Sequence, residues 1–239
     1  MKLGIMQPYF LPYIGYWQLL NTVDTYVVYD DVNYIKGGWI NRNRILVNGD
    51  IKYISLELQG ASSYKKINEI KLSPNKKSRS KLLKTIEQSY KKAPMFQDVF
   101  PLMERIFLFD TQNLSSFVYN SIDLIMQYLK INTKLVLSSE LEKNNELKGQ
   151  DKVIEICKKL NADTYINAAG GKQLYSFRDF SQQGINLKFL ETDSNITYNQ
   201  LTDDFYPSLS ILDILMMLSV DDINTLLTKY RLLDESCYA

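Results

Sequence analysis

Apolar runs and amphipathic segments alternate along the first part of the chain. Residues 2–6 form an apolar run that Pro8 and Pro12 bring to an end, because neither proline can donate to the ladder of a central strand. Apolar positions then recur at helical spacing over residues 13–21, and residues 26–29 form a second apolar run. This order predicts a strand, a turn, a helix and a strand, a unit that usually makes two parallel strands joined by a right-handed crossover.

Strand and helix patterns continue through the rest of the chain. Residues 45–58 alternate around Asn48-Gly49, which predicts a hairpin with strands near residues 44–47 and 51–58. Ser210 is placed to cap the helix that follows it, with Asp213 three residues on. Further patterns predict strands at residues 67–72, 136–137, 164–167 and 187–190, and helices at residues 78–92, 99–107, 114–129, 151–160, 211–218 and 221–230.

Alternation of strands and helices predicts an α/β fold. No low-complexity linker or internal repeat divides the chain, so we expect a single domain over residues 1–239. Its α/β core, with the hairpin, would take about residues 1–60 and 130–195. A helical insertion would take about residues 75–130, and a helical C-terminal part about residues 205–235.

The composition adds no further structural element, but it argues against several kinds of partner and site. The 28 basic and 27 acidic residues nearly cancel, so no strong field favours DNA or an anionic membrane. The amino terminus lacks a signal-peptide pattern, and no stretch reaches the roughly 18 apolar residues of a membrane span. Cys157 and Cys237 form no Cys-x-x-Cys motif, and Cys157 falls on the apolar side of its predicted helix. We therefore expect a cytoplasmic protein without membrane insertion, and we assign no metal ligand.

The chain contains no histidine. A Ser-His-Asp or Cys-His arrangement and the histidine-bearing zinc hydrolase motifs are therefore excluded. Any proton transfer must use Asp, Glu, Lys, Tyr or Cys, or a substrate amine that needs little assistance.

Residues 7–17 form the first of three candidate clusters. Two prolines fix the backbone, Gly15 permits close approach of a ligand or strand, and the following helix start suits an anion. Packing of the aromatic residues in a core explains the same residues equally well. The binding candidates in this cluster are Gln7, Pro8, Tyr9 and Tyr16.

Residues 30–44 are the richest cluster, with two carboxylates, a lysine, two arginines and two aromatic residues. A solvated surface loop is the alternative, but the charges interleave with Tyr34 and Trp39 and follow a predicted strand, where α/β sheets bind ligands. Arginine grips phosphate or carboxylate bidentately, and a carboxylate accepts a proton. The catalytic candidates are Asp30, Asp31, Lys36 and Asn43, and the binding candidates are Trp39, Arg42 and Arg44.

Residues 167–175 form the third cluster, a glycine pair and a lysine after a predicted strand. The segment lacks the spacing of a P-loop and of a dinucleotide fingerprint, so a plain turn is favoured unless the other clusters converge on it. Its binding candidates are Gly170, Gly171, Lys172 and Tyr175.

Five segments carry a resemblance to a known family: GIMQPYFLPYIGYWQLL, DDVNYIKGGWINRNRIL, SYKKAPMF, YINAAGGKQLY and FYPSLSILDILM. In this order, and over essentially the whole chain, they resemble the WbqC-like proteins. The resemblance implies a place in bacterial gene clusters for O-antigen, the lipopolysaccharide side chain, and related surface glycans. It also implies transfer of glycine or another amino acid onto an amino sugar. The family motif commonly has histidine before its Gln-Pro pair, where this chain has Met6.

The order of a strand, a Phe-x-Pro turn with glycine, a helix, a strand and a basic loop is also similar to nucleotidylyltransferase-type domains. This likeness implies a Rossmann-like, three-layer core. Such domains bind ATP phosphates with a histidine-rich turn, but here Tyr16 follows Gly15 where the second histidine would stand. Nucleotide binding through Lys36, Arg42 and Arg44 is compatible with this sequence, whereas nucleotidyl transfer would lack its usual groups.

Two functions remain open. In the first, a transferase binds a nucleotide-linked amino sugar through Arg42 and Arg44, and Asp30 or Asp31 takes the proton of the attacking amine. Its acyl donor would be aminoacyl-tRNA or another activated acyl compound. In the second, the protein is a non-catalytic partner that binds a nucleotide sugar or another enzyme of the pathway. The cofactor stays open, with ATP and a divalent cation as candidates.

Overall fold

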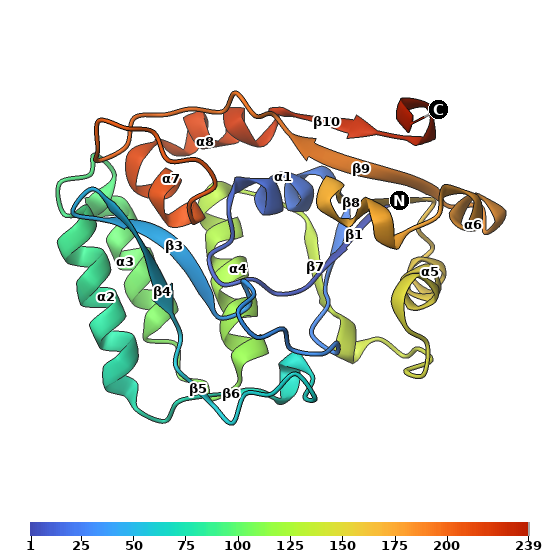
Figure 1. Cartoon of the computed structure of the whole chain (residues 1–239), viewed down its shortest axis with the longest axis horizontal. Coiled ribbons are helices and arrows are strands. Elements are labelled where there is room, and N and C mark those ends of the chain that lie inside the picture. The colour runs from blue at the N-terminus through green and yellow to red at the C-terminus, as the bar shows by residue number, and fades with distance from the viewer. Residues whose placement is uncertain (239) are drawn as a thin grey trace.

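A six-stranded sheet forms the centre of the computed structural model, which describes residues 1–238 (Figure 1). The strand order is β10-β9-β8-β1-β2-β7. Five of these strands run parallel, and β10 alone pairs antiparallel, with β9. The prediction of an α/β protein is confirmed. The strands are β1 (Lys2–Met6), β2 (Thr25–Val28), β7 (Lys134–Leu137), β8 (Thr164–Ala168), β9 (Asn186–Thr192) and β10 (Tyr230–Leu233).

Helices cover both faces of the sheet, because its buried strands carry apolar side chains on both sides. Along β2, Tyr26 and Val28 face one core, whereas Val27 between them faces the other. The first core takes side chains from α1 (Ile14–Thr22), α2 (Lys76–Tyr90), α3 (Phe96–Phe107), α4 (Leu114–Leu129), α7 (Ile211–Met217) and α8 (Val220–Leu227). The second takes them from α5 (Gly149–Lys159) and α6 (Phe177–Gln182). None of the described helices combines the length and apolar character needed to cross a bilayer.

The order of the parallel strands fixes where loops converge. β1 lies in the middle, β2 and β7 follow on one side, and β8 and β9 follow on the other. The direction of strand succession therefore reverses between β1 and β8. In open parallel sheets, the crevice beyond the carboxyl ends of the strands at such a reversal is the usual place for a ligand.

The segment between β2 and β7 adds a hairpin and three helices beside the sheet. Strands β3 (Arg42–Val47) and β4 (Asp50–Ser55) form the hairpin, as expected. Asn48 and Gly49 both have positive φ at its turn, as a two-residue turn of this hand requires. A second pair, β5 (Leu58–Gln59) and β6 (Lys71–Leu72), leads to the helices α2, α3 and α4.

One local prediction was incomplete, and two elements were not predicted. The strand expected at residues 67–72 begins as a 3-10 turn, η1 (Ile67–Glu69), because the Glu69 carboxylate accepts from the Lys66 N–H and closes the turn. Helix α6 is only six residues long, too short to show a period. The strand β10 exists through pairing with β9, which lies about 40 residues earlier in the chain, so no local pattern indicates it.

Candidate functional site

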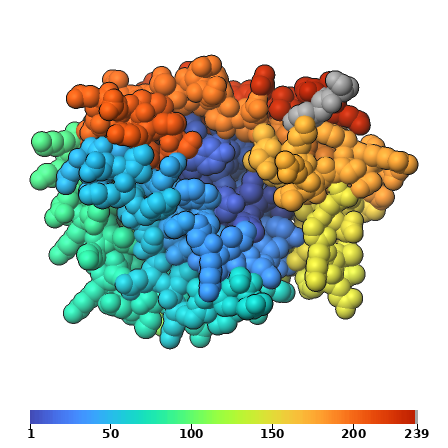
Figure 2. Space-filling model, viewed as in Figure 1, coloured from blue at the N-terminus to red at the C-terminus, as the bar shows by residue number. Residues whose placement is uncertain are grey.

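The loops that follow the parallel strands border a hollow on the face shown in Figure 2, where residues of the amino-terminal segment, in dark blue, lie at its floor. Residues 7–13 follow β1, Asp30 and Asp31 follow β2, and the 3-10 helices η2 (Ser138–Glu140) and η3 (Ala169–Leu174) follow β7 and β8. All three predicted clusters therefore lie at the carboxyl ends of parallel strands.

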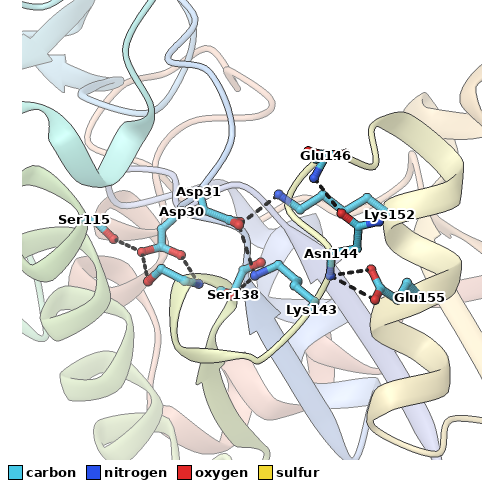
Figure 3. Close-up of polar contacts among 10 residues, drawn as sticks. Asp30, Asp31, Ser115, Ser138, Lys143, Asn144, Glu146, Lys152 and Glu155 are labelled. Carbon is cyan, nitrogen blue, oxygen red and sulfur yellow. Dashed lines mark hydrogen bonds and ion pairs between the residues drawn. The ribbon is translucent and has the colours of Figure 1, made fainter.

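Asp30 is a buried residue that ties loops together. Its Oδ1 accepts from the Ser139 N–H at 2.9 Å, and its Oδ2 accepts from the Ser139 hydroxyl at 2.7 Å and the Ser115 hydroxyl at 3.3 Å (Figure 3). Asp30 thus joins the start of α4 to the turn after β7. Both of its oxygens already have donors.

Asp31 lies between two buried lysines (Figure 3). Its Oδ2 is 2.8 Å from Lys152 Nζ and 3.0 Å from Lys143 Nζ, and Lys143 also donates to the Ser138 carbonyl. Burial would raise the pKa of Asp31, but the ammonium groups of Lys152 and Lys143 bring it below its usual value. We call Asp31, Lys143 and Lys152 the charge cluster. Among themselves, two ammonium groups and one carboxylate leave one surplus positive charge, and the Asp30 carboxylate, whose hydrogen-bond donors are all neutral, is the adjacent residue in the chain.

Tyr29 connects this cluster to the glycine turn. Lys152 Nζ lies 5.3 Å from the centre of the Tyr29 ring. Burial, the charge of Asp31 and the Tyr175 phenol all raise the pKa of Tyr29. The second and third predicted clusters therefore come within electrostatic reach of each other at this edge of the sheet.

The glycine pair itself is part of η3. A Cβ on Gly171 would lie 2.7 Å from Asn167 Nδ2, so a larger residue there would have to displace that side chain, whereas a Cβ on Gly170 would meet no atom within 4 Å. Tyr175 accepts a hydrogen bond from the Tyr165 hydroxyl at 3.3 Å and packs into the second core. Lys172 extends from the exposed surface of the same turn.

The first predicted cluster divides between core and surface. Tyr16 is buried, and its hydroxyl donates to the Gln7 carbonyl at 3.2 Å, so its ring belongs to the core. Pro8 is buried as well. Tyr9 is partly exposed, and its ring centre lies 5.8 Å from that of Tyr16.

Backbone hydrogen bonds join three distant segments, residues 9–13, 39–44 and 208–211, into a unit that we call the cradle. The Ser210 N–H donates to the Arg44 carbonyl and the Ile211 N–H to the Pro12 carbonyl, both at 2.9 Å. The Phe10 N–H donates to the Trp39 carbonyl at 2.9 Å. These bonds fix the relative positions of segments that lie up to 200 residues apart.

Asn43 locks the cradle from inside. Its Nδ2 donates to the Phe10 carbonyl at 3.0 Å and the Leu11 carbonyl at 2.8 Å, and its Oδ1 accepts from the Arg44 N–H at 2.8 Å. The Ser210 hydroxyl donates to the Leu11 carbonyl too, at 2.8 Å. Asn43 is buried and fully engaged, which gives it a positioning part in this structure.

A pocket of about 290 Å³ opens over the cradle. It brings together four of the residues that the sequence singled out, and three that it did not. The predicted site residues that line it are Tyr9, Trp39, Asn43 and Arg44. The other lining residues are Pro12, Tyr13 and Ser208. A larger groove along β9 and β10 contains none of the predicted site residues.

The three basic residues of the second cluster lie in different places and do not form one site. Arg44 lines the pocket and donates from Nη2 to the Ser208 carbonyl at 3.1 Å. Arg42 donates to the Gly37 and Gly38 carbonyls, and its guanidinium carbon lies 4.7 Å from the centre of the Tyr53 ring. Lys36 is exposed and does not line the pocket.

A buried aspartate stands behind the cradle. Asp213 accepts from the hydroxyls of Tyr90 and Tyr198, both at 2.8 Å, and from Gln200 Nε2 at 3.1 Å. Burial raises its pKa, although these three hydrogen bonds lower it in part. Ser210 caps α7 as expected, by accepting from the Leu212 N–H, but Asp213 turns inward instead of completing a capping box.

Sequence reasoning missed Tyr29, Lys143, Lys152 and Ser208. For Lys152 a signal exists, because it lies four residues before the buried Ile156 and so falls on the buried face of α5. Lys143 and Ser208 lie in loops whose position depends on distant contacts. Cys157 is buried in the second core, as expected, and burial raises the pKa of its thiol to about 12. Within residues 1–238, no three Cys, Asp or Glu side chains gather as metal ligands.

Comparison with known proteins places the chain in a family. The chain is 27% identical over 216 residues to an uncharacterized protein of Mycobacterium tuberculosis, Rv1507c, which covers 90% of this chain and 92% of that protein. No solved structure shows significant similarity to it. The family model described as "WbqC-like protein family" matches residues 7–225, a range that contains the charge cluster and the cradle. The chain therefore belongs to the WbqC-like protein family.

Proposed function

We propose that this protein binds a nucleotide-linked amino sugar at the carboxyl edge of its sheet and transfers an acyl group, such as glycine, onto the sugar amine. It would work in the cytoplasm, in the assembly of O-antigen or a related bacterial surface glycan. The observation that carries the proposal is the charge cluster, where two buried lysines share one carboxylate beside the ends of β2 and β7.

A surplus ammonium in a buried place is unfavourable unless an anion balances it. The phosphates of a nucleotide sugar would supply that anion. The order of the parallel strands supports the same conclusion, because it is the order that Rossmann-like, nucleotide-binding sheets use. A nucleotidyl transfer is not part of this proposal, since the chain contains no histidine to bind the reacting phosphates.

The geometry changes the role proposed for the carboxylates. Both oxygens of Asp30 already accept hydrogen bonds, and the lowered pKa of Asp31 makes that carboxylate a weak base. We propose that Asp31 holds the two lysines in place for the phosphates. Attack of an amine on an activated acyl group then depends mainly on positioning.

The first test compares Lys152→Met with a matched control, Lys159→Met, on the exposed side of the same helix. Lys152→Met leaves Asp31 and Lys143 as a balanced pair, so the fold should persist while the surplus charge disappears. In thermal-shift measurements, UDP, UDP-linked amino sugars and ATP should stabilise the native chain and Lys159→Met equally, and should stabilise Lys152→Met less. Equal stabilisation of Lys152→Met would contradict the phosphate site.

The second test concerns the reaction. The protein is incubated with a UDP-linked amino sugar and with glycyl-tRNA or another activated glycine, and the products are weighed by mass spectrometry. Formation of one amide per sugar, with loss of the donor's leaving group, is the expected result. If the UDP-linked amino sugar binds but its mass stays unchanged, the proposal that the protein is a transferase would be overturned.

That outcome would favour the second candidate, a non-catalytic protein that binds the nucleotide sugar or a partner enzyme. One observation supports this candidate. Neither Asp30 nor Asp31 has a carboxylate oxygen that is both exposed and free of a donor, since the one without a donor, Asp31 Oδ1, is buried.

A further inference from the structure

The pocket over the cradle has a composition that the proposed reaction does not use. Three of its walls are the rings of Tyr9, Tyr13 and Trp39, and Tyr13 and Trp39 remain partly exposed. Arg44 is the one charged residue among those that line it. Aromatic walls with a single guanidinium suit a ring that carries one anionic group.

Arg44 is incompletely satisfied where it lies. Its Nη2 donates to the Ser208 carbonyl, but its buried Nε donates to no acceptor among the described residues. Its guanidinium carbon lies 5.7 Å from the centre of the Trp39 ring. That Nε is inaccessible to solvent, so a ligand would meet the other N–H groups of the guanidinium where it lines the pocket, and these form a fork that donates to a carboxylate or phosphate oxygen.

Two residues beside the pocket have strained backbone conformations, and hydrogen bonds from neighbouring side chains hold them in place. Leu11 has a φ of 45° and Ser208 a φ of 56°, a region that residues other than glycine seldom adopt. The carbonyl of each is fixed, that of Leu11 by Asn43 and Ser210, and that of Ser208 by Arg44. Strain that the surrounding structure holds in place is typical of ligand-binding loops, because a rigid site loses less entropy when it binds.

We propose that this pocket is a binding site for a small ring bearing a carboxylate or phosphate, with the anionic oxygens on Arg44 and the ring between Tyr9, Tyr13 and Trp39. The ligand is a nucleotide or an acidic sugar, two sources that share this chemistry. The site depends on the cradle alone, so it does not require the charge cluster or the acyl transfer proposed above.

Tryptophan fluorescence can report on this pocket directly. The chain has two tryptophans, of which Trp17 is fully buried and Trp39 is 38% exposed. Acrylamide should therefore quench mainly Trp39, and a bound ring should protect it. We would titrate two matched pairs to millimolar concentration, UMP with uridine and glucuronate with glucose. At least one anionic member should protect Trp39 about tenfold more tightly than its neutral partner, because a hydrogen bond to a charged group is lost with the anion.

Arg44→Gln should weaken that protection by about tenfold, and Arg44→Lys should restore only part of it, since lysine lacks the planar fork. Arg105→Gln is the matched control, because Arg105 is exposed on α3 and lies outside the pocket, and it should bind as the native chain does. Lys152→Met should also bind normally, which separates this site from the charge cluster. The melting temperature of each variant confirms that it is folded.

Protection by UMP alone identifies the nucleotide as the source, and protection by glucuronate alone identifies the acidic sugar. Protection by neither anion would overturn the proposal. Equal affinity for an anion and its neutral partner would overturn it too, and so would an equal loss in the Arg105→Gln control.

Discussion

The charge cluster contains one buried aspartate, Asp31, and a second, Asp213, lies behind the cradle. The two carboxylates are held in opposite ways. Asp31 receives two lysine ammonium groups, which lower its pKa. Asp213 receives two phenols and an amide, all uncharged, and its burial raises its pKa. Burial is similar in the two places, so the charge of the partners decides the direction of the shift.

The same difference separates what each region offers to a ligand. In the charge cluster the charged side chains themselves are buried, and their net positive charge would attract an anion of the ligand. Behind the cradle the buried carboxylate faces neutral donors, and Arg44, the one charged residue that lines the pocket, makes a single side-chain hydrogen bond among the described residues. The following changes test this contrast, from the largest expected effect to the smallest.

Asp31→Asn should have the largest effect on stability. It leaves two buried ammonium groups without their carboxylate, which should lower the free energy of unfolding by about 3–5 kcal/mol. Urea denaturation measures this change. Asp110→Asn is the control, because Asp110 and Lys76 form an exposed ion pair, and it should leave the urea midpoint unchanged. Similar midpoints for both variants would mean that the charge cluster is not a buried ion pair.

Asn43→Ala should weaken the cradle by about 2–3 kcal/mol, because the buried carbonyl of Phe10 and the N–H of Arg44 lose their partner. The carbonyl of Leu11 keeps the Ser210 hydroxyl. In contrast to Asp31→Asn, this variant should also lose the protection of Trp39 by anionic rings. Normal protection with reduced stability would show that Asn43 supports the fold but not the pocket.

The two aspartates should give opposite dependence on pH. The pKa of Asp31 is lower in the folded state than in the unfolded chain, so its stabilisation is present above the unfolded pKa and is lost as pH falls through the folded pKa. The pKa of Asp213 is higher in the folded state, so its contribution is fully present below the unfolded pKa and is lost as pH rises through the folded pKa.

Asp213→Asn should therefore remove part of the stability that the native chain has at low pH. The difference in unfolding free energy between native chain and variant should shrink as pH rises above the unfolded pKa of aspartate, near 3.9. Urea titrations at several pH values measure it. A difference that grows with pH would mean that Asp213 is ionised in the folded protein.

Lys36→Ala should have the smallest effect. Lys36 is exposed and lies outside the pocket and the charge cluster, so stability and Trp39 protection should both stay unchanged. A loss of binding in this variant would mean that the ligand contacts the exposed loop at residues 35–38, and that Arg44 is not its main anion-binding residue.

The sequence was sufficient for the parts of the fold that local patterns determine. The Asn48-Gly49 hairpin, the parallel pair β1 and β2, the cap at Ser210 and the core position of Cys157 all follow from spacing and side-chain type. Each depends on residues that are close together in the chain.

The candidate site was only partly predictable, because its contacts are non-local. Sequence reasoning found Asp31 and Arg44 through their position after β2, but Lys143, Lys152 and Ser208 reach them from 100 or more residues away. Tyr16 was predicted to bind a ligand and Asn43 to be catalytic, because composition cannot tell an aromatic residue or amide that contacts a ligand from one that holds the surrounding structure in place. Whether the predicted residues bind a sugar nucleotide stays a prediction.

The hydrogen bonds from Ser210 and Ile211 to Arg44 and Pro12 also set the time at which the pocket can exist. A ribosome makes the walls from residues 9–13 and 39–44 early, but it adds the segment that closes them after more than four-fifths of the chain. A nascent chain therefore carries an open, unbraced cradle until near the end of synthesis. Any ligand of this pocket meets it only in the finished protein, and chains that stop before residue 208 should have no such site.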